Sequence, residues 1–403
     1  MNRFRRTLVA WCLLLPLPAA ATNDALPPPV ERALAVRSVP AATLSVVVHD
    51  LAADETVLEW LPDTPRNPAS TIKLLTTLVA LDVLGPSYTW PTEVYAMGDV
   101  EAGRLRGDLL LKGYGDPYLV TERVWQLLRQ VRQTGIHDIE GDLLIDDSYF
   151  EVEEEDPAAF DQQPLRAYNV VPNALLMNFK VVRYWFEPEF DSGSVRVWLD
   201  PPLGNLEVDN RIALRPGRCR GFQRGITISA NEAIDRMTFS GRFPRGCNRY
   251  AMDRTALDHN AFVFGLFTSL WRESGGRFDG GYRNAVAPED AEPLLTFRSV
   301  PLVDVIDLVN KHSNNVMARH LLYTLGAEVE GAPGTAAGGR RVIADWLADR
   351  GLRTETLALD NGAGLSRDVR ITARDLVALL AFAWRQPYMP EYVSSLSLVG
   401  HDG

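Results

Sequence analysis

The stretch PRNPASTIKLLTTLVALDVLG, residues 65–85, decides how we interpret the fold. Pro65 and Pro68 interrupt the chain, and apolar side chains then recur at helical spacing from Ser70 to Leu84. A Gly-Pro pair at residues 85–86 ends the pattern. The stretch therefore predicts a buried helix that begins at Ser70.

The first turn of this helix carries a serine and a lysine three residues apart. That spacing places Ser70 and Lys73 on one helix face, where the hydroxyl and the amine can meet. A serine hydroxyl is a weak nucleophile unless a neighbouring base takes its proton, and a lysine can be that base when burial lowers its pKa. Only four of the 41 basic residues are lysines, so a lysine here is notable. The alternative is a capped helix start with a solvated lysine one turn later.

A second polar motif, Ser313-Asn314-Asn315, lies between two helical patterns and follows Lys311-His312. In acyl-transferring enzymes with a Ser-x-x-Lys sequence, a Ser-x-Asn motif supplies a hydroxyl that relays a proton and an amide that holds the substrate backbone. Alone, the same three residues would also make an ordinary interhelical turn. Two motifs in this order, each at a helix terminus, favour the catalytic interpretation of both.

The separation of the two motifs is a further signal, because Ser313 follows Ser70 by 243 residues. It resembles the D-alanyl-D-alanine carboxypeptidase/endopeptidase family, also called class C low-molecular-mass penicillin-binding proteins, whose members carry extra domains inside this gap. Class A β-lactamases and simple D,D-carboxypeptidases have a much shorter gap. The likeness runs from about residue 30 to the last residue and includes three further stretches: Gly107–Pro117, Gly141–Phe150 and Asp360–Arg367.

The resemblance implies a serine peptidase that acts on peptidoglycan stem peptides, needs no cofactor and is acylated by β-lactam antibiotics. Ser70 would attack the carbonyl between two D-alanines, and Lys73 would be its base. Ser313 would pass a proton toward the leaving amine, and Asn315 would hold the substrate backbone. The resemblance also places three residues near the peptide side chain of the substrate, namely Asp146, Phe150 and Arg367. Arg367 could equally be a structural ion-pair partner, and Asp146 a turn former.

Pattern and resemblance together imply an α/β fold with a serine β-lactamase/D,D-peptidase-like core, in which helices flank a sheet. Residues 22–90 and 255–403 would form this core. Residues 91–254 consist of short alternating segments broken by Gly, Pro and Asp, which indicates a β-rich insertion. The core patterns predict strands over 43–49 and 55–60 and helices over 30–36, 261–273, 302–312, 316–325, 341–350 and 373–384.

Residues 1–21 have the features of a cleaved secretory signal peptide: basic side chains, an apolar run over 8–17 and three alanines over 19–21. We therefore expect a periplasmic protein whose mature form begins near Thr22. No later stretch approaches the roughly 20 apolar residues that a membrane-spanning helix needs. Cys12 could mark a lipoprotein, but it lies inside the apolar run, where a lipid-attachment site would follow a small residue.

Loss of the signal peptide leaves two cysteines, Cys219 and Cys247, in a compartment where disulfides persist. One bridge between them is expected, and two buried free thiols are the alternative. No His or Cys pair stands at zinc-site spacing, so we expect no metal site. The formal net charge of -11 argues against a nucleic-acid partner, which would need a basic face.

The family's third motif, Lys-Thr-Gly or Lys-Ser-Gly on a strand that lines the site, does not occur in the 403 residues. Val399–Gly403 better matches a Gly-x-Asp-Gly stretch that precedes the third motif, so we expect the chain to end before that strand. The strand would supply one oxyanion donor, whose loss costs on the order of 10² to 10³ in rate. Two alternatives stay open: a serine β-lactamase, against which the long insertion argues, and a catalytically impaired wall-binding protein on the same fold.

Overall fold

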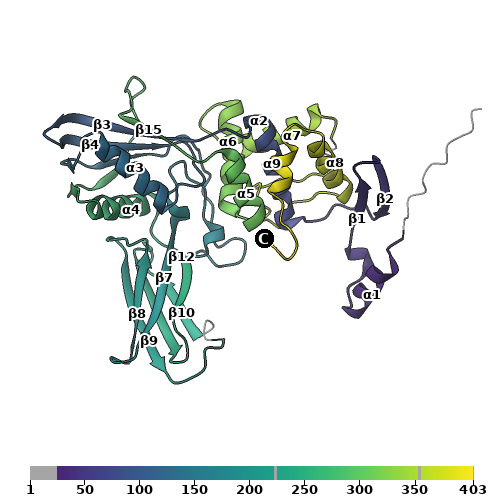
Figure 1. Ribbon diagram of the computed structural model, residues 1–403, viewed down its shortest axis with the longest axis horizontal. Coiled ribbons are helices and arrows are strands. Elements are labelled where there is room, and N and C mark those ends of the chain that lie inside the picture. Colours follow the sequence, from purple (N-terminus) through teal and green to yellow (C-terminus); the bar gives the residue numbers. More distant parts are fainter. Residues whose placement is uncertain (1–24, 222–224, 353–354, 403) are drawn as a thin grey trace, which may run out of the picture. The chain divides into compact units, whose positions relative to one another are not determined.

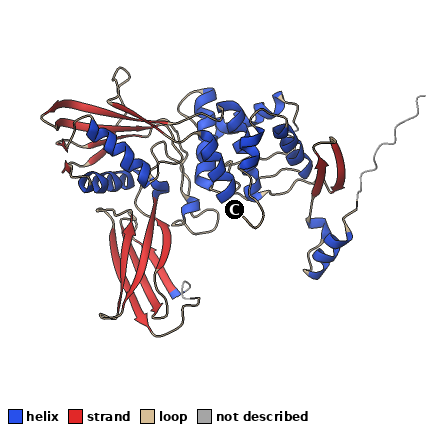
Figure 2. Ribbon diagram, viewed as in Figure 1, coloured by secondary structure: helices blue, strands red, loops and turns tan. Residues whose placement is uncertain are grey.

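A computed structural model describes residues 25–221, 225–352 and 355–402 (Figures 1 and 2). The predicted signal peptide, residues 1–21, lies outside the described residues. Contacts divide the chain into two units, Met1–Thr64 with Thr372–Ala381, and Pro65–Ile371 with Phe382–Gly403. Within the described ranges, no helix combines the length and the apolar character needed to cross a bilayer.

The smaller unit contains helix α1 (Pro28–Val36) and an antiparallel pair of strands, β1 (Val46–Asp50) and β2 (Glu55–Trp60). Strand β2 has the predicted bounds. Strand β1 begins later than the predicted residue 43, because Ala41–Thr43 forms a 3-10 turn. The unit also contains most of helix α8 (Ala373–Trp384), where the Arg374 guanidinium pairs with the carboxylates of Glu59 and Asp63.

The larger unit has a helical body built around helix α2 (Lys73–Leu84), which buries residues on all its faces. Helix α2 packs against α5 (Leu302–His312) and α6 (Asn315–Glu330), and α6 packs against α7 (Ala336–Asp349). A short helix, α9 (Met389–Ser394), contacts α5. The structure confirms the predicted helices of this body. However, α6 ends five residues later than predicted, α7 begins five residues earlier, and α2 begins at Lys73, after a 3-10 turn that contains Ser70.

A mixed sheet of seven strands lies in the region predicted as a β-rich insertion. Its main path has the order β13-β5-β4-β3-β15, β6 pairs with β4, and β14 pairs with β6. The strands are β3 (Pro91–Glu101), β4 (Arg104–Gly113), β5 (Asp138–Ile139), β6 (Leu143–Asp146), β13 (Arg277–Phe278), β14 (Tyr282–Asn284) and β15 (Leu295–Arg298). The last three follow residue 254, so the sheet draws on chain beyond the predicted insertion.

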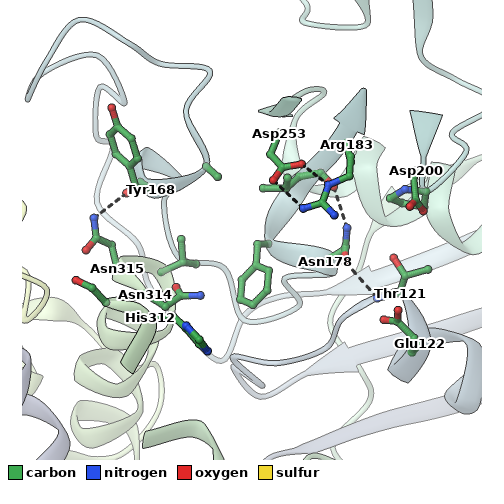
Figure 3. A pocket seen from close by; sticks show the side chains of 16 residues that line it. Thr121, Glu122, Tyr168, Asn178, Arg183, Asp200, Asp253, His312, Asn314 and Asn315 are labelled. Carbon is green, nitrogen blue, oxygen red and sulfur yellow. Dashed lines mark hydrogen bonds and ion pairs between the residues drawn. The ribbon is translucent and has the colours of Figure 1, made fainter. Parts of the chain in front are cut away.

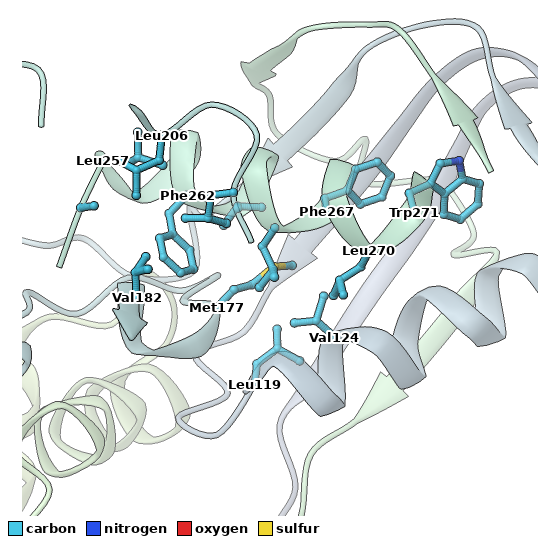
Figure 4. Close-up of a cluster of buried hydrophobic side chains, with 14 of the residues drawn as sticks. Leu119, Val124, Met177, Val182, Leu206, Leu257, Phe262, Phe267, Leu270 and Trp271 are labelled. Atoms are coloured by element: carbon cyan, nitrogen blue, oxygen red, sulfur yellow. The ribbon is translucent and has the colours of Figure 1, made fainter. Parts of the chain in front are cut away.

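Two helices, α3 (Thr121–Gln133) and α4 (His259–Glu273), pack together and contribute to the large apolar core of this region (Figure 4). The sequence analysis missed α3, which lies in a segment interpreted as β-rich. Its buried residues nevertheless have helical spacing: Val124, Leu127, Leu128 and Val131. Figure 4 shows Val124 of α3 close to Leu270 of α4.

Two three-stranded sheets complete the region, with orders β12-β7-β8 and β10-β11-β9. Their strands are β7 (Val181–Glu189), β8 (Ser194–Asp200), β9 (Glu207–Arg215), β10 (Ile226–Ala230), β11 (Arg236–Pro244) and β12 (Tyr250–Thr255). The ring centroid of Phe239 in β11 lies 4.8 Å from that of Tyr184 and 5.3 Å from that of Phe186, both in β7. Aromatic contacts therefore join the two sheets. A disulfide links Cys219 to Cys247.

The disulfide closes a loop with a sequence separation of 28 residues. We expect the double variant Cys219→Ser/Cys247→Ser to lose roughly 3 kcal/mol of unfolding free energy, because the bridge restricts the unfolded chain. Urea denaturation followed by fluorescence measures this loss. The parent protein under reducing conditions is the control and should match the variant. Equal midpoints for oxidised parent and variant would contradict the expectation.

Candidate active site

Ser70 lies in a 3-10 turn, Ala69–Ile72, that leads directly into α2. The preceding Ala69 has a φ of 48°, which non-glycine residues adopt uncommonly. Its N–H donates to Asn67 Oδ1 at 2.8 Å, which holds the turn. Ser70 is exposed, whereas Ile72 and Lys73 are buried. The turn therefore presents the hydroxyl to solvent and takes the lysine into the interior.

Lys73 is only 2% exposed, and its amine makes three hydrogen bonds. Nζ lies 3.1 Å from Ser70 Oγ, 2.7 Å from Asn315 Oδ1 and 2.6 Å from the main-chain oxygen of Ala363. Burial lowers the pKa of Lys73 to about 8. The structure thus brings together Ser70, Lys73 and Asn315 from the two predicted motifs, and a substantial fraction of Lys73 is neutral near pH 8.

The Ser313-Asn314-Asn315 motif forms the junction between α5 and α6, as its turn chemistry predicts. Ser313 ends α5 with a left-handed backbone, φ 54°, and is exposed. Asn314 caps α6, because its side chain accepts from Met317 N at 3.1 Å. Asn315 is the first residue of α6, and its Nδ2 donates to the main-chain oxygen of Tyr168 at 3.4 Å. The cap therefore fixes the place from which Asn315 reaches Lys73.

A cavity of about 500 Å³ adjoins this junction (Figure 3). Ser313 and Asn315 line it from the helical body, and Tyr168 and Phe179 line it from the inserted region. Polar side chains complete the lining, among them the ion pair between Arg183 and Asp253 at 2.8 Å. An elongated polar ligand can thus lie beside the Asn315 amide.

The loop that follows α7 supplies the third partner of Lys73. Asn361 Oδ1 accepts from the N–H groups of Ala363 at 3.0 Å and Gly364 at 3.1 Å. Gly364 has a φ of 78°, and a Cβ built there would lie 1.9 Å from the main-chain oxygen of Ala69. Only glycine fits this approach without displacement of the turn before Ser70.

The three residues assigned to the substrate side chain have different surroundings. The buried Asp146 carboxylate accepts from Ser148 Oγ at 2.6 Å and from Ala287 N at 2.8 Å. Phe150 is 6% exposed and packs on Tyr323, with ring centroids 5.3 Å apart. As placed, both side chains join the end of β6 and the segment after it to distant parts of the chain, and their contact with a substrate stays a prediction.

Arg367, the third of these residues, is exposed and lines a second cavity of about 450 Å³. Its guanidinium lies over the Phe160 ring, 5.1 Å from the centroid, and donates to the Phe160 main-chain oxygen at 3.3 Å. Charged side chains of both signs share this lining, including Glu153, Arg340 and Asp360. Arg367 is therefore accessible, and its part in substrate binding stays a prediction.

Sequence reasoning missed Asn361 and the Ala363 carbonyl, although Asp360–Arg367 was already a stretch of interest. A main-chain oxygen leaves no side-chain signature in a sequence. The Gly-Ala-Gly run at residues 362–364 was the available signal, because glycines often mark a close approach of two backbones.

Comparison with known proteins gives a consistent result. The model of the D-Ala-D-Ala carboxypeptidase 3 (S13) family matches residues 28–403. A D-alanyl-D-alanine carboxypeptidase of Actinomadura sp. (strain R39) is 30% identical over 375 residues, which cover 89% of this chain and 68% of that protein. D-alanyl-D-alanine carboxypeptidase DacB of Haemophilus influenzae is 20% identical over 363 residues, which cover 90% and 75%. The crystal structure of penicillin binding protein 4 of Haemophilus influenzae has a TM-score of 0.74 over 89% of this chain and 79% of that chain, at 19% identity.

The close approach of Gly364 to Ala69 generates a stability prediction. We expect Gly364→Ala to lower the unfolding free energy by about 1 to 3 kcal/mol more than Gly85→Ala does, because only Gly364 meets backbone. Gly85 is a matched control, since it has a φ of 83° and nothing within 4 Å of its built Cβ. Chemical denaturation of both variants measures the difference. Equal losses of unfolding free energy in the two variants would show that the positive φ alone accounts for the glycine at residue 364.

Proposed function

Because the chain belongs to the D-Ala-D-Ala carboxypeptidase 3 (S13) family, we propose that it is a serine D-alanyl-D-alanine carboxypeptidase/endopeptidase whose acyl-enzyme forms on Ser70. The observation that carries this assignment is the 3.1 Å contact between Lys73 Nζ and Ser70 Oγ. The lysine is buried, and burial lowers its pKa to about 8, as a general base for a serine hydroxyl requires. The substrates are peptidoglycan stem peptides.

Acylation begins when the neutral Lys73 amine takes the Ser70 proton and Oγ attacks the carbonyl carbon between two D-alanines. The tetrahedral intermediate then collapses and the C–N bond breaks. The leaving amine gains the proton that Lys73 took from Ser70, by way of the Ser313 hydroxyl. An ester between the peptide and Ser70 remains. Water then hydrolyses this ester, which releases the shortened peptide and restores the Ser70 hydroxyl.

Asn315 is suited to hold the substrate backbone while its other amide atom stays on Lys73. Its Oδ1 lies 2.7 Å from Lys73 Nζ, whereas its Nδ2 makes only a long bond of 3.4 Å to Tyr168. A substrate carbonyl can replace that weak bond at small cost. The adjoining cavity of about 500 Å³ then receives the peptide. Arg367, which lines the second cavity, is proposed to recognise the peptide side chain together with Asp146 and Phe150.

Covalent inhibition by β-lactams follows from the same chemistry, because the ring amide stands in for the scissile peptide bond. The Haemophilus influenzae penicillin binding protein 4 has been solved in complex with a novel β-lactam. The signal-peptide features of residues 1–21 and the Cys219–Cys247 disulfide support a periplasmic location.

The first functional prediction concerns the nucleophile and its base. In the full-length protein, Ser70→Ala should abolish covalent labelling by a fluorescent penicillin, and Lys73→Arg should slow it by at least 10²-fold, because arginine keeps the charge but cannot act as a base. Gel fluorescence measures the label, and circular dichroism checks folding. Labelling of folded Lys73→Arg at the parent rate would refute the mechanism.

The same assay separates the three candidate functions of the parent protein. A carboxypeptidase should retain the label, a serine β-lactamase should turn the probe over, and an impaired wall-binding protein should stay unlabelled. Release of D-alanine from a stem peptide with a D-Ala-D-Ala terminus then checks the peptidase activity directly.

The second functional prediction concerns pH. The pKa of Lys73 is lowered to about 8 by burial, and only the neutral amine accepts the Ser70 proton. The acylation rate constant should therefore rise by about tenfold per pH unit below pH 8 and level off above it. Stopped-flow labelling from pH 6 to pH 10 gives the profile. A rate constant that falls between pH 6.5 and pH 8.5 would exclude a neutral lysine as the base.

A further inference from the structure

We propose that the main-chain carbonyl of Ala363, held by the Asn361 side chain, aims the lone pair of neutral Lys73 at the Ser70 hydroxyl. Asn361 is then a positioning residue for acylation. The inference rests on the proposed roles of Ser70 and Lys73 and adds the group that orients the base.

The hydrogen-bonding capacity of the amine carries the argument. A neutral lysine amine has two N–H donors and one lone pair, and Nζ of Lys73 has three hydrogen-bond neighbours. Two of them, Asn315 Oδ1 and the Ala363 carbonyl oxygen, can only accept. They take both N–H groups, so the lone pair is left for Ser70 Oγ–H, which is the one neighbour that can donate. This is the arrangement that proton transfer from serine needs.

The Ala363 carbonyl oxygen is needed because it occupies the second N–H group of the neutral Lys73 amine. Without it, the amine would still satisfy Asn315 with one N–H, but the second N–H could turn to Ser70 Oγ. The lone pair would then point away from the hydroxyl, and Ser70 would accept a hydrogen bond when it needs to donate one. Two fixed acceptors remove that unproductive orientation.

The loop around Ala363 is built to hold the carbonyl still. Asn361 Oδ1 accepts from the N–H groups of Ala363 and Gly364, and its Nδ2 donates to the Leu365 main-chain oxygen at 2.9 Å. Thr76 Oγ1, one turn beyond Lys73 on α2, donates to the Gly362 oxygen at 2.7 Å. The loop is therefore attached to the same helix that carries the base.

The loop also touches the other side of the nucleophile turn. Gly364 lies against the main-chain oxygen of Ala69, and Asn67 Nδ2 donates to the Ser366 oxygen at 2.9 Å. One segment thus contacts the chain just before Ser70 and the amine three residues after it. The position of this loop therefore fixes how the Ser70 hydroxyl lies relative to the Lys73 amine.

A carbonyl acceptor also affects the pKa of the amine, because it stabilises the charged form. Burial lowers the pKa of Lys73. The 2.6 Å hydrogen bond to the Ala363 oxygen should act in the opposite direction, because a carbonyl acceptor favours the charged amine. Displacement of the carbonyl should therefore lower the pKa further and, at the same time, misdirect the lone pair. The plateau and the midpoint of the pH profile report these two effects separately.

The test compares pH profiles of penicillin acylation for the parent protein, Asn361→Ala and Asn361→Asp. In Asn361→Ala, the plateau rate constant should fall at least tenfold and the midpoint should move to lower pH. Asn361→Asp keeps an acceptor for both N–H groups, loses the donor to the Leu365 oxygen and adds a negative charge. It should therefore keep much more of the plateau than Asn361→Ala and move the midpoint to higher pH.

Asn231→Ala is the matched control. Asn231 Oδ1 accepts from Arg236 N at 3.0 Å in the turn between β10 and β11, so the variant loses a similar brace in the inserted region. Its profile should equal that of the parent.

An unchanged profile in Asn361→Ala, or a lower plateau with an unchanged midpoint, overturns the inference and leaves Asn361 with a structural role. If Asn361→Ala does not fold, Asn361→Asp decides through its plateau, and a loss of tenfold or more with the acceptor kept overturns the inference as well. The proposed function fails differently: the parent protein stays unlabelled, or Ser70→Ala is labelled like the parent.

Discussion

The buried amine of Lys73 is the constraint on which the site depends. An ionisable group in the interior is costly unless its hydrogen bonds are made there, and Lys73 makes three. Its partners Asn315 and Ala363 follow it by 242 and 290 residues. A stable interior around Lys73 therefore requires three distant segments to meet at one atom. The same convergence that satisfies the amine brings the Ser70 hydroxyl and the Asn315 amide to Lys73, which are the groups proposed as nucleophile, substrate-binding amide and base.

The far end of α2 is fixed by a second set of polar contacts, so the whole helix is held. The Asp82 carboxylate accepts from Trp346 Nε1 at 2.7 Å and from the Tyr388 hydroxyl at 2.5 Å. Near the start of α2, the Tyr392 hydroxyl donates to the Leu74 main-chain oxygen at 2.8 Å. A helix tied along its length cannot slide or rotate freely, and Lys73 at its first position keeps its register with Asn315.

Sequence reasoning reached the parts of the site that depend on local spacing. Ser70 and Lys73 were found because one helical turn brings positions i and i+3 together. Asn315 was found because a Ser-x-Asn motif between two helices follows the Ser-x-x-Lys motif in the order that this class of enzyme uses. The Ala363 carbonyl could not be found this way, because a tertiary contact through the main chain has no residue signature. Helix α3 was missed for another reason: its amphipathic period was present, but the Gly- and Pro-rich neighbouring segments dominated the interpretation of the region.

The same contacts assign different roles to the helical body and to the inserted region of the larger unit. The Lys73 amine is held from the helical body, by Asn315 of α6 and by the Ala363 carbonyl of the loop at 360–366. The inserted region reaches the site through Tyr168, whose carbonyl bonds Asn315, and through the cavity wall that includes Phe179 and Arg183. Changes in the insertion should then alter what binds beside Asn315, whereas the proposed proton transfer between Ser70 and Lys73 should depend on the loop. Under the proposed mechanism, substrate preference can therefore vary in this architecture without disturbance of the contact between Ser70 and Lys73.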